Sequence, residues 1–381
     1  MKKTIFLIVI LAMTLSIFAL PTFCIAQENG AEVAYSEYIA DFDSGCVLGA
    51  HNENSKHEIA SMVKIMTANI VFEEIEKGAF ALDDKIVVSS VASGMGGSQM
   101  FLDANSEYKV SDLLKGIIVV SANDASVAMA EKIAGSQDAF VNIMNERAQS
   151  WGMTNTKFVN ATGLPSAEEQ FSTAKDVNIM TRKLMSHDKY YQFAKIWLED
   201  FVHPSGRVTQ LANTNKLIRF YNGCVGGKTG YTDKAGFCLS ACAMRNDLKV
   251  VATVVGVKDS KTRFAKVTKM FDSAFATYKN KIVYKSGEKM DSQLTVRNSP
   301  IATIDVTPQQ NVAILEKNGA KLTDIRVEMN ENMRAPIAKN DVVGKIIIST
   351  ADGEKTINLL SMIDAPKSTY LDWLRKIALY W

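Results

Sequence analysis

Three short polar strings hold the residues of this chain that could do chemistry. They are Ser61-Met62-Val63-Lys64, Ser121-Ala122-Asn123 and Lys228-Thr229-Gly230. In this order they supply a nucleophile with a base, a hydroxyl and amide pair that can relay a proton, and a cation that can hold a carboxylate. The three strings together predict acyl transfer through a serine.

The first string predicts an activated serine. Residues three apart on a helix share one face, with Cβ atoms about 5–6 Å apart, so the side chains of Ser61 and Lys64 can meet. A serine hydroxyl is a weak nucleophile until a base takes its proton. A lysine buried in apolar surroundings near a second cation has a lowered pKa and can serve as that base. The helix N-terminus would also direct backbone N–H groups toward an oxyanion beside Ser61.

The pattern Ser-x-x-Lys carries little weight without its setting. Four further matches begin at Ser106, Ser172, Ser186 and Ser286, and none has the apolar helical context of Ser61. Ser-x-Asn and Lys-Thr-Gly, in contrast, each occur once. The order and setting of all three strings therefore select Ser61.

The second and third strings also allow ordinary readings. Ser121 and Asn123 are expected in a turn between two helices, where serine can relay a proton and asparagine can orient the lysine or hold a substrate amide. The same residues suit turn and capping chemistry. Lys228 and Thr229 open a strand and can bind an anion, and Gly230 is expected to let a ligand backbone approach closely. A Lys-Thr-Gly string at a strand edge can also be only a turn.

Strands and helices alternate around these strings. Residues 34–48 predict a β-hairpin, and a mostly buried helix is expected from Ser61 to Lys77, stopped at Gly78. Strands at 237–244 and 249–257 predict an antiparallel hairpin.

Capping residues mark the expected helix ends. The expected N-caps are Ser111, Asp124, Ser136 and Ser260, and the expected C-terminal glycines are Gly135 and Gly152. Strands, a helical middle, further strands and a closing helix indicate an α/β domain with an antiparallel sheet and a helical insertion.

The chain is too long for one ordinary core. After Lys279, short β-rich runs predict a small all-β domain that ends in a hairpin around Asp352-Gly353. The expected parts are a signal peptide at 1–26, a catalytic domain at 27–281, a β-rich domain at 282–365 and an amphipathic helix at 366–381.

The first residues are typical of an export signal. Lys2 and Lys3 precede the apolar run Ile5–Leu20, Pro21 breaks this run, and Cys24-Ile25-Ala26 offers small residues for cleavage. A retained membrane anchor is the alternative, because the run approaches the minimum spanning length. The pattern favours cleavage and a location outside the cytoplasm.

Charge and cysteine spacing exclude two classes of ligand. Cleavage after residue 26 removes two of 43 basic residues and no acidic one, which leaves 41 of each sign. No nucleic acid partner is expected, because no excess of positive charge is available to neutralise phosphates. The cysteines and histidines match no metal site. Cys238 and Cys242 lie too far apart along one strand to bridge and predict buried free thiols, although an exported protein could pair others.

The last fifteen residues predict a helix with two different faces. One face would hold Tyr370, Leu371, Leu374, Ile377, Ala378 and Trp381, and the other Asp372, Arg375 and Lys376. Tyrosine and tryptophan near the chain end suit a membrane interface. We expect peripheral attachment to a membrane surface, and docking on the β-rich domain is the alternative.

With its three strings placed, the chain resembles the serine-type D-Ala-D-Ala carboxypeptidases of peptidase family S11, the low-molecular-mass penicillin-binding proteins. The resemblance runs from about Ala34 to Trp381. Further matching segments are Gly97–Leu102, Phe158–Leu164, Asn213–Leu217 and Lys228–Gly236. The departures from the usual family pattern are Ile59 for Pro, Val63 for Thr, Ala122 for Gly and Gln170-Phe171 for His-Tyr. None of these departures removes a reacting group.

The resemblance implies the roles of the helical strings. Ser61 would be the acylated nucleophile, and Lys64 would accept its proton. Ser121 and Asn123 would assist proton transfer and position the substrate.

The resemblance also implies how the substrate is held. Lys228 and Thr229, with Arg263 from the closing helix, would bind the terminal carboxylate. Backbone N–H groups of Ser61 and Tyr231 would form the oxyanion hole.

The implied reaction removes the last D-alanine from a peptidoglycan pentapeptide stem, at the outer face of the cytoplasmic membrane, without a cofactor or metal. Penicillin and other β-lactams would acylate the same serine. A β-lactamase is one alternative, although Glu168-Glu169 lacks the Glu-x-x-x-Asn pattern of the deacylating loop in the class A enzymes. A penicillin-binding sensor without turnover is the other alternative.

Overall fold

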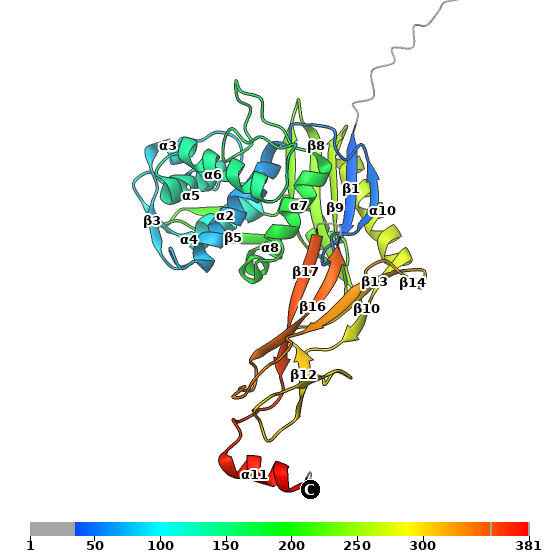
Figure 1. Ribbon diagram of the computed structural model, residues 1–381. Helices are drawn as coiled ribbons and strands as arrows, with labels where there is room; N and C mark the ends of the chain where they lie inside the picture. The colour runs from blue at the N-terminus through cyan, green and yellow to red at the C-terminus, as the bar shows by residue number, and fades with distance from the viewer. Residues whose placement is uncertain (1–34, 351–352, 380–381) are drawn as a thin grey trace, which may run out of the picture. The chain divides into compact units, whose positions relative to one another are not determined.

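A five-stranded antiparallel sheet organises the first part of the protein (Figure 1). The computed structural model describes residues 35–350 and 353–379, so the expected signal peptide lies outside the described residues. The strand order is β2-β1-β9-β8-β7. The strands are β1 (Ser36–Asp41), β2 (Val47–His51), β7 (Cys224–Thr232), β8 (Gly236–Arg245) and β9 (Leu248–Val257). Both predicted hairpins are present, and β1 joins them by pairing with β9.

Helices cover both faces of the sheet. Successive residues of β9 point to opposite sides. Val250 and Val254 lie in one core with Phe271 of α10 (Ser260–Thr277). Val251 and Val255 lie in the other core, which includes residues of α7 (Ala174–Leu184). Burial on both faces explains why β9 reads as a nearly continuous apolar run.

The predicted helical insertion lies between β2 and β7. Its helical elements are η1 (Ala60–Val63), α2 (Lys64–Glu76), α3 (Ser90–Ser93), α4 (Val110–Lys115), η2 (Gly116–Val120), α5 (Asn123–Ala134), α6 (Gln137–Ser150), α7, η3 (Asp188–Tyr190), α8 (Tyr191–Ala194) and α9 (Leu217–Phe220). Two small hairpins complete it, β3 (Lys85–Val87) with β4 (Glu107–Lys109) and β5 (Leu198–Val202) with β6 (Val208–Ala212).

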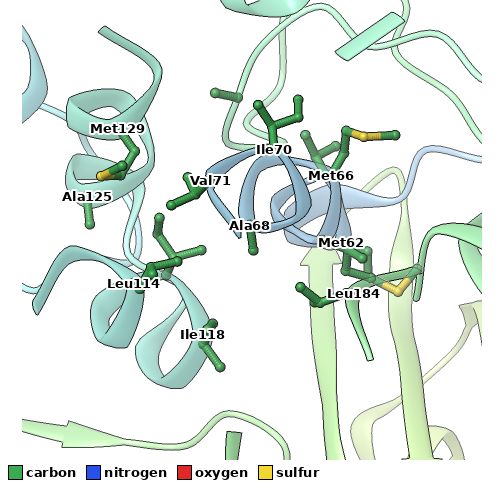
Figure 2. Packing of buried hydrophobic residues seen from close by; sticks show 14 of the residues in the cluster. Met62, Met66, Ala68, Ile70, Val71, Leu114, Ile118, Ala125, Met129 and Leu184 are labelled. Atoms are coloured by element: carbon green, nitrogen blue, oxygen red, sulfur yellow. The ribbon is translucent and has the colours of Figure 1, made fainter. Parts of the chain in front are cut away.

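Helix α2 is the buried centre of this insertion. Apolar residues occupy most of its surface, so it lies in a core with neighbours on several sides. Figure 2 shows Leu114 of α4, Ala125 and Met129 of α5, and Leu184 of α7 around it. The first residue of α2, Lys64, is therefore carried into an apolar environment.

Of the predicted helix ends in the insertion, Ser136, Gly135 and Gly152 are correct, whereas Ser111 is wrong. Gly152, with φ +72°, directly follows the C-cap Trp151 of α6. Ser136 caps α6 by accepting the N–H of Ala139 at 3.2 Å, and Gly135 ends α5 with φ +78°. Ser111 is not a cap, because α4 already begins at Val110.

The two remaining predicted caps are also wrong. The side chain of Asp259, not Ser260, accepts the N–H of Thr262 at 2.7 Å and caps α10. Helix α5 begins at Asn123, so Asp124 lies inside its first turn, and its carboxylate accepts N–H groups from a distant loop.

The second part of the chain is β-rich, as predicted, and has its own core. Its strands are β10 (Tyr278–Tyr284), β11 (Gln293–Thr295), β12 (Thr303–Pro308), β13 (Val312–Lys317), β14 (Ala320–Lys321), β15 (Ile325–Met329), β16 (Val342–Thr350) and β17 (Gly353–Ser361). They form two sheets, ordered β10-β13-β14 and β11-β12-β17-β16-β15. The predicted hairpin is β16–β17, and Asp352 of its turn lies outside the described residues.

Helix α11 (Tyr370–Leu379) ends the described part of the chain. Five of its large apolar residues are exposed, up to 77% for Tyr370, and the others are Leu371, Trp373, Leu374 and Ile377. Trp381 of the predicted apolar face lies outside the described residues. In the segments 35–350 and 353–379, no helix combines the length and apolar character needed to span a bilayer.

The four cysteines of the described part are free thiols. Cys238 and Cys242 of β8 both face the core that contains α2, as predicted. Burial raises the pKa of each thiol to about 12, so both stay protonated at neutral pH.

Candidate active site

Ser61 and Lys64 meet, as their spacing predicts. Lys64 is 1% exposed, and its Nζ donates to Oγ of Ser61 at 3.1 Å and to the carbonyl of Thr162 at 2.6 Å. The local backbone differs from the prediction, because Ser61 lies in the 3-10 turn η1 and the α-helix begins only at Lys64. The tighter turn leads directly into α2 and keeps both side chains on one face.

The surroundings of Lys64 favour its neutral form. Burial lowers the pKa of Lys64 well below its ordinary value, the charge of Lys228 lowers it further, and Asp124 opposes both effects. A neutral Lys64 can accept the Ser61 hydroxyl proton while one N–H still donates to Thr162. Such a group can act as a general base near neutral pH.

Two glycines let neighbouring segments approach the turn that holds the serine. A Cβ on Gly163, whose φ is +81°, would lie 2.0 Å from the carbonyl oxygen of Ala60. A Cβ on Gly230 would lie 2.6 Å from the carbonyl oxygen of Ile59. The prediction that Gly230 admits a ligand backbone is therefore wrong, because the chain's own backbone fills that space.

Ser121 and Asn123 present buried polar atoms. Ser121 has φ +65° at the end of η2, and Asn123 opens α5. Nδ2 of Asn123 donates to the carbonyl of Gly96 at 2.6 Å. Among the described residues, Oγ of Ser121 and Oδ1 of Asn123 have no hydrogen-bond partner. Because an unsatisfied buried polar atom costs about 1–3 kcal/mol, both atoms are suited to a ligand.

Lys228 and Thr229 are buried on β7. Nζ of Lys228 donates to the carbonyl of Thr229 at 3.1 Å. Burial, helped by the nearby Arg263 guanidinium, lowers the pKa of Lys228 to about 7. An anionic ligand would relieve this unfavourable burial of positive charge.

Arg263 supports β7 from α10. Its guanidinium donates to the carbonyls of Gly230 and Cys238, each at 3.2 Å. The same group lies over the rings of Phe237 and Phe264, at 5.4 and 4.7 Å from their centroids. Arg263 therefore fixes the strand and adds positive charge near Lys228, and direct contact with a substrate carboxylate stays a prediction.

The two expected oxyanion N–H groups belong to neighbouring segments, because β7 packs against η1. Ser61 lies in η1, and Tyr231 follows Gly230 on β7. The ring of Tyr231 is exposed and packs against Phe237 in a tilted arrangement with centroids 4.3 Å apart, and its hydroxyl donates to Asp233 at 2.8 Å. Their role in holding an oxyanion stays a prediction.

A loop that the sequence predictions left without a role supports Lys64. Oδ1 of Asn160 accepts the N–H of Thr162 at 3.1 Å and the N–H of Gly163 at 2.7 Å. This turn fixes the Thr162 carbonyl that Lys64 contacts. The string Asn-Ala-Thr-Gly is a recognisable signal for such an asparagine turn.

Glu168 and Glu169, the two acids that a β-lactamase could use, are both exposed. Glu168 is 72% exposed at its side chain and pairs with Lys157 at 3.2 Å on the surface. A surface carboxylate in an ion pair is poorly placed to activate a water at Ser61.

All residues of this site except Arg263 lie within a segment that matches a known family. Residues 25–259 match the family described as D-alanyl-D-alanine carboxypeptidase, peptidase family S11. The chain belongs to this family. Residues 278–364 match the C-terminal domain of penicillin-binding protein 5. These matches confirm the predicted family, its fold and its class of activity, that of a hydrolase acting as a D-Ala-D-Ala carboxypeptidase.

Relatives of the family resemble this chain over nearly its whole length. D-alanyl-D-alanine carboxypeptidase DacF of Bacillus subtilis is 36% identical over 350 residues, which cover 91% of this chain and 89% of the relative. DacA of Escherichia coli is 30% identical, with coverages of 91% and 88%. Penicillin-binding protein 5 of Haemophilus influenzae has a similar structure, with a TM-score of 0.67, 29% identity and coverages of 88% and 98%.

Proposed function

We propose that this chain removes the terminal D-alanine from peptidoglycan pentapeptide stems through an acyl-enzyme on Ser61, and that β-lactams acylate the same residue. The 3.1 Å contact between Oγ of Ser61 and Nζ of the buried Lys64 carries the proposal, because it joins a nucleophile to a base whose pKa is depressed. Membership of the carboxypeptidase family supports the same reaction.

Acylation uses the helical side of the site. Lys64 accepts the hydroxyl proton as Oγ of Ser61 attacks the carbonyl carbon of the penultimate D-alanine. N–H groups of Ser61 and Tyr231 hold the oxyanion. The C–N bond then breaks, and the leaving amine takes a proton from Lys64, with Ser121 as the relay.

Recognition uses the strand side. Lys228 and Thr229 bind the free carboxylate of the terminal D-alanine, and Arg263 strengthens the positive field. Asn123 offers its unpaired Oδ1 to the substrate amide. Water then hydrolyses the ester and frees Ser61. Only groups of this chain take part, so the route needs neither a cofactor nor a metal.

We further propose a location and a division of the chain. Cleavage of 1–26 would export the protein, the catalytic domain would span 27–281 and the β-rich domain 282–365. The segment 366–381 would attach the protein peripherally to the outer face of the cytoplasmic membrane. The exposed apolar side chains of Tyr370, Leu371, Trp373, Leu374 and Ile377 support this attachment.

The decisive experiment measures D-alanine release from a pentapeptide ending in D-Ala-D-Ala, beside penicillin hydrolysis by the same preparation. We expect release by the protein and none by Ser61→Ala, which should also lose labelling by fluorescent penicillin. Labelling that persists in Ser61→Ala would reject the assignment of the nucleophile. Penicillin hydrolysis without D-alanine release would indicate a β-lactamase, and stable labelling without either turnover would indicate a sensor.

A further inference from the structure

Asp124, the neighbour of Asn123, is a fully buried carboxylate at 0% exposure. Its Oδ1 accepts the N–H of Met100 at 3.3 Å, and its Oδ2 accepts the N–H of Leu102 at 3.0 Å. Within its own helix it accepts only the N–H of Ala125, at 2.9 Å. Its main partners thus come from a loop more than 20 residues away in the sequence.

The residue between these two amides is held in a costly conformation. Phe101 has φ +63° and a ring that is 54% exposed. A bulky residue adopts this backbone region only when its surroundings impose it, at a cost of about 1–3 kcal/mol. Asp124 holds this conformation by accepting the N–H groups of the residues on both sides of Phe101. Arg207 donates to the carbonyl of Phe101.

The segment that Asp124 holds, residues 96–102, in turn fixes the position of Asn123. The N–H of Asn123 donates to the carbonyl of Ser98 at 2.7 Å, and its Nδ2 donates to the carbonyl of Gly96 at 2.6 Å. The bond from Nδ2 to Gly96 fixes the orientation of the amide, and its Oδ1 is buried and unpaired among the described residues, so this oxygen is available to a ligand.

Asp124 also faces the reacting lysine electrostatically. The charged groups that act on Lys64 are Lys228 from β7 and Asp124 from α5, and Asp124 is the one that favours the ammonium form. Asp124 acts in the same sense on the buried His203, which also faces Arg207 and Asp103.

We propose that Asp124 is a positioning residue for acyl transfer at Ser61. Its carboxylate fixes the 96–102 segment and thereby orients the Asn123 amide toward the site. Its negative charge also helps Lys64 to remain a strong enough base. The inference rests on the proposed function. Its two parts make separate predictions, one for the rate and one for the pH profile.

Asp124→Asn tests both parts. The amide can accept only on one oxygen and places its NH2 against a backbone N–H, so the 96–102 segment should shift. We expect acylation by fluorescent penicillin to slow by about 10- to 100-fold, the effect of a misplaced group. The acidic limb of the rate should move to lower pH by about 0.5 unit or more, because the pKa of Lys64 loses an opposing charge.

Asp176→Asn is the matched control. Asp176 is also a buried carboxylate in the first turn of a helix, and it accepts the N–H of the distant Asn155 at 3.1 Å. We expect Asp176→Asn to lower the thermal stability about as much as Asp124→Asn does, while the acidic limb of the acylation rate stays at the same pH. His203→Gln should leave the limb in place as well. An unmoved limb in Asp124→Asn would overturn the proposal and assign Asp124 to the fold alone.

A second variant separates position from charge. Phe101→Gly removes the strain of the positive φ, because glycine adopts it freely. The double variant Phe101→Gly with Asp124→Asn should recover part of the rate but keep the shifted limb. If neither Asp124→Asn nor the double variant folds, Asp124 is structural and the proposal fails. Absence of any labelling of the unmodified protein would instead reject the proposed function.

Discussion

The two sides of the active site are built in different ways. On the helical side, Ser61 and Lys64 alternate with residues of the large core around α2, so that packing of Met62, Val63 and Ile65 fixes their positions. On the strand side, β7 carries the buried Lys228, whose pKa is lowered to about 7, and the exposed Tyr231 three residues further on. We therefore expect the chemical step to depend on packing and the recognition of the substrate to depend on charge.

The largest expected effect is on the helical side. Lys64→Ala should slow acylation by fluorescent penicillin about 10²- to 10⁴-fold, because the base for Ser61 is lost. A time course of labelling at saturating penicillin measures it. Lys109→Ala is the control, since Lys109 ends another Ser-x-x-Lys match but lies on the surface in an ion pair with Asp83. A near-normal rate in Lys64→Ala would remove Lys64 as the base.

A substitution at the contact between β7 and the turn that holds Ser61 should affect both sides of the site. Gly230→Ala places a Cβ 2.6 Å from the carbonyl of Ile59, so β7 and η1 must separate. We expect a loss of about 1–3 kcal/mol in the free energy of unfolding, together with slower acylation. Gly49→Ala, whose Cβ would meet only Ile39 at 3.4 Å, should stay within about 0.5 kcal/mol. Equal unfolding transitions for the two variants would show that the contact between β7 and the turn accommodates a Cβ at position 230 without loss of stability.

The strand side should make the rate of acylation depend on pH. Lys228 is charged below its pKa of about 7 and loses its charge above it, so recognition of a carboxylate should weaken as pH rises. A bound carboxylate raises this pKa. The rate constant for acylation at low penicillin concentration should therefore show a basic limb above about pH 7.

The control for this pH profile is Lys228→Arg, because arginine keeps its charge. The basic limb should disappear in this variant, even if the overall rate falls. A basic limb that is identical in Lys228→Arg would assign the titration to another group and would leave the strand side without its proposed role.

The smallest effect on catalysis is expected from the tail. Deletion of residues 367–381 should release the protein from anionic liposomes and leave labelling by penicillin in solution unchanged. Leu371 and Leu374 are exposed apolar residues of α11, so replacing both with serine should also weaken binding, whereas Arg375→Gln should weaken it less. Sedimentation with liposomes that is unaltered by the deletion would contradict membrane attachment.

The sequence predicted the reacting residues better than their supports. The spacing of Ser61 and Lys64 fixes their separation on any helical turn, so their contact could be foreseen. The carbonyl of Thr162 comes from a loop about 100 residues away, and no local pattern predicts that approach. Gly230 was assigned to a ligand because its partner, the backbone at Ile59, is revealed only by tertiary packing.

The wrong helix caps have a common physical cause. Asp259 and Ser260 are adjacent and both can cap, so the choice between them depends on how the helix docks on the sheet. Asp124 resembles a cap by sequence, but the folded protein uses it for the amides of the 96–102 segment. Short polar residues identify where a helix begins, and tertiary contacts decide which of them does the capping.

The pairing of β1 with β9 has a consequence for how the molecule folds. Ser36 pairs with Val255, so the central sheet cannot close until almost the whole first part of the chain is available. Contacts between such distant segments carry a large loop-closure entropy and slow the folding reaction. Because β1 is made early and its partner β9 late, the central sheet stays incomplete until late in synthesis. This suits a polypeptide that is proposed to cross a membrane before it folds.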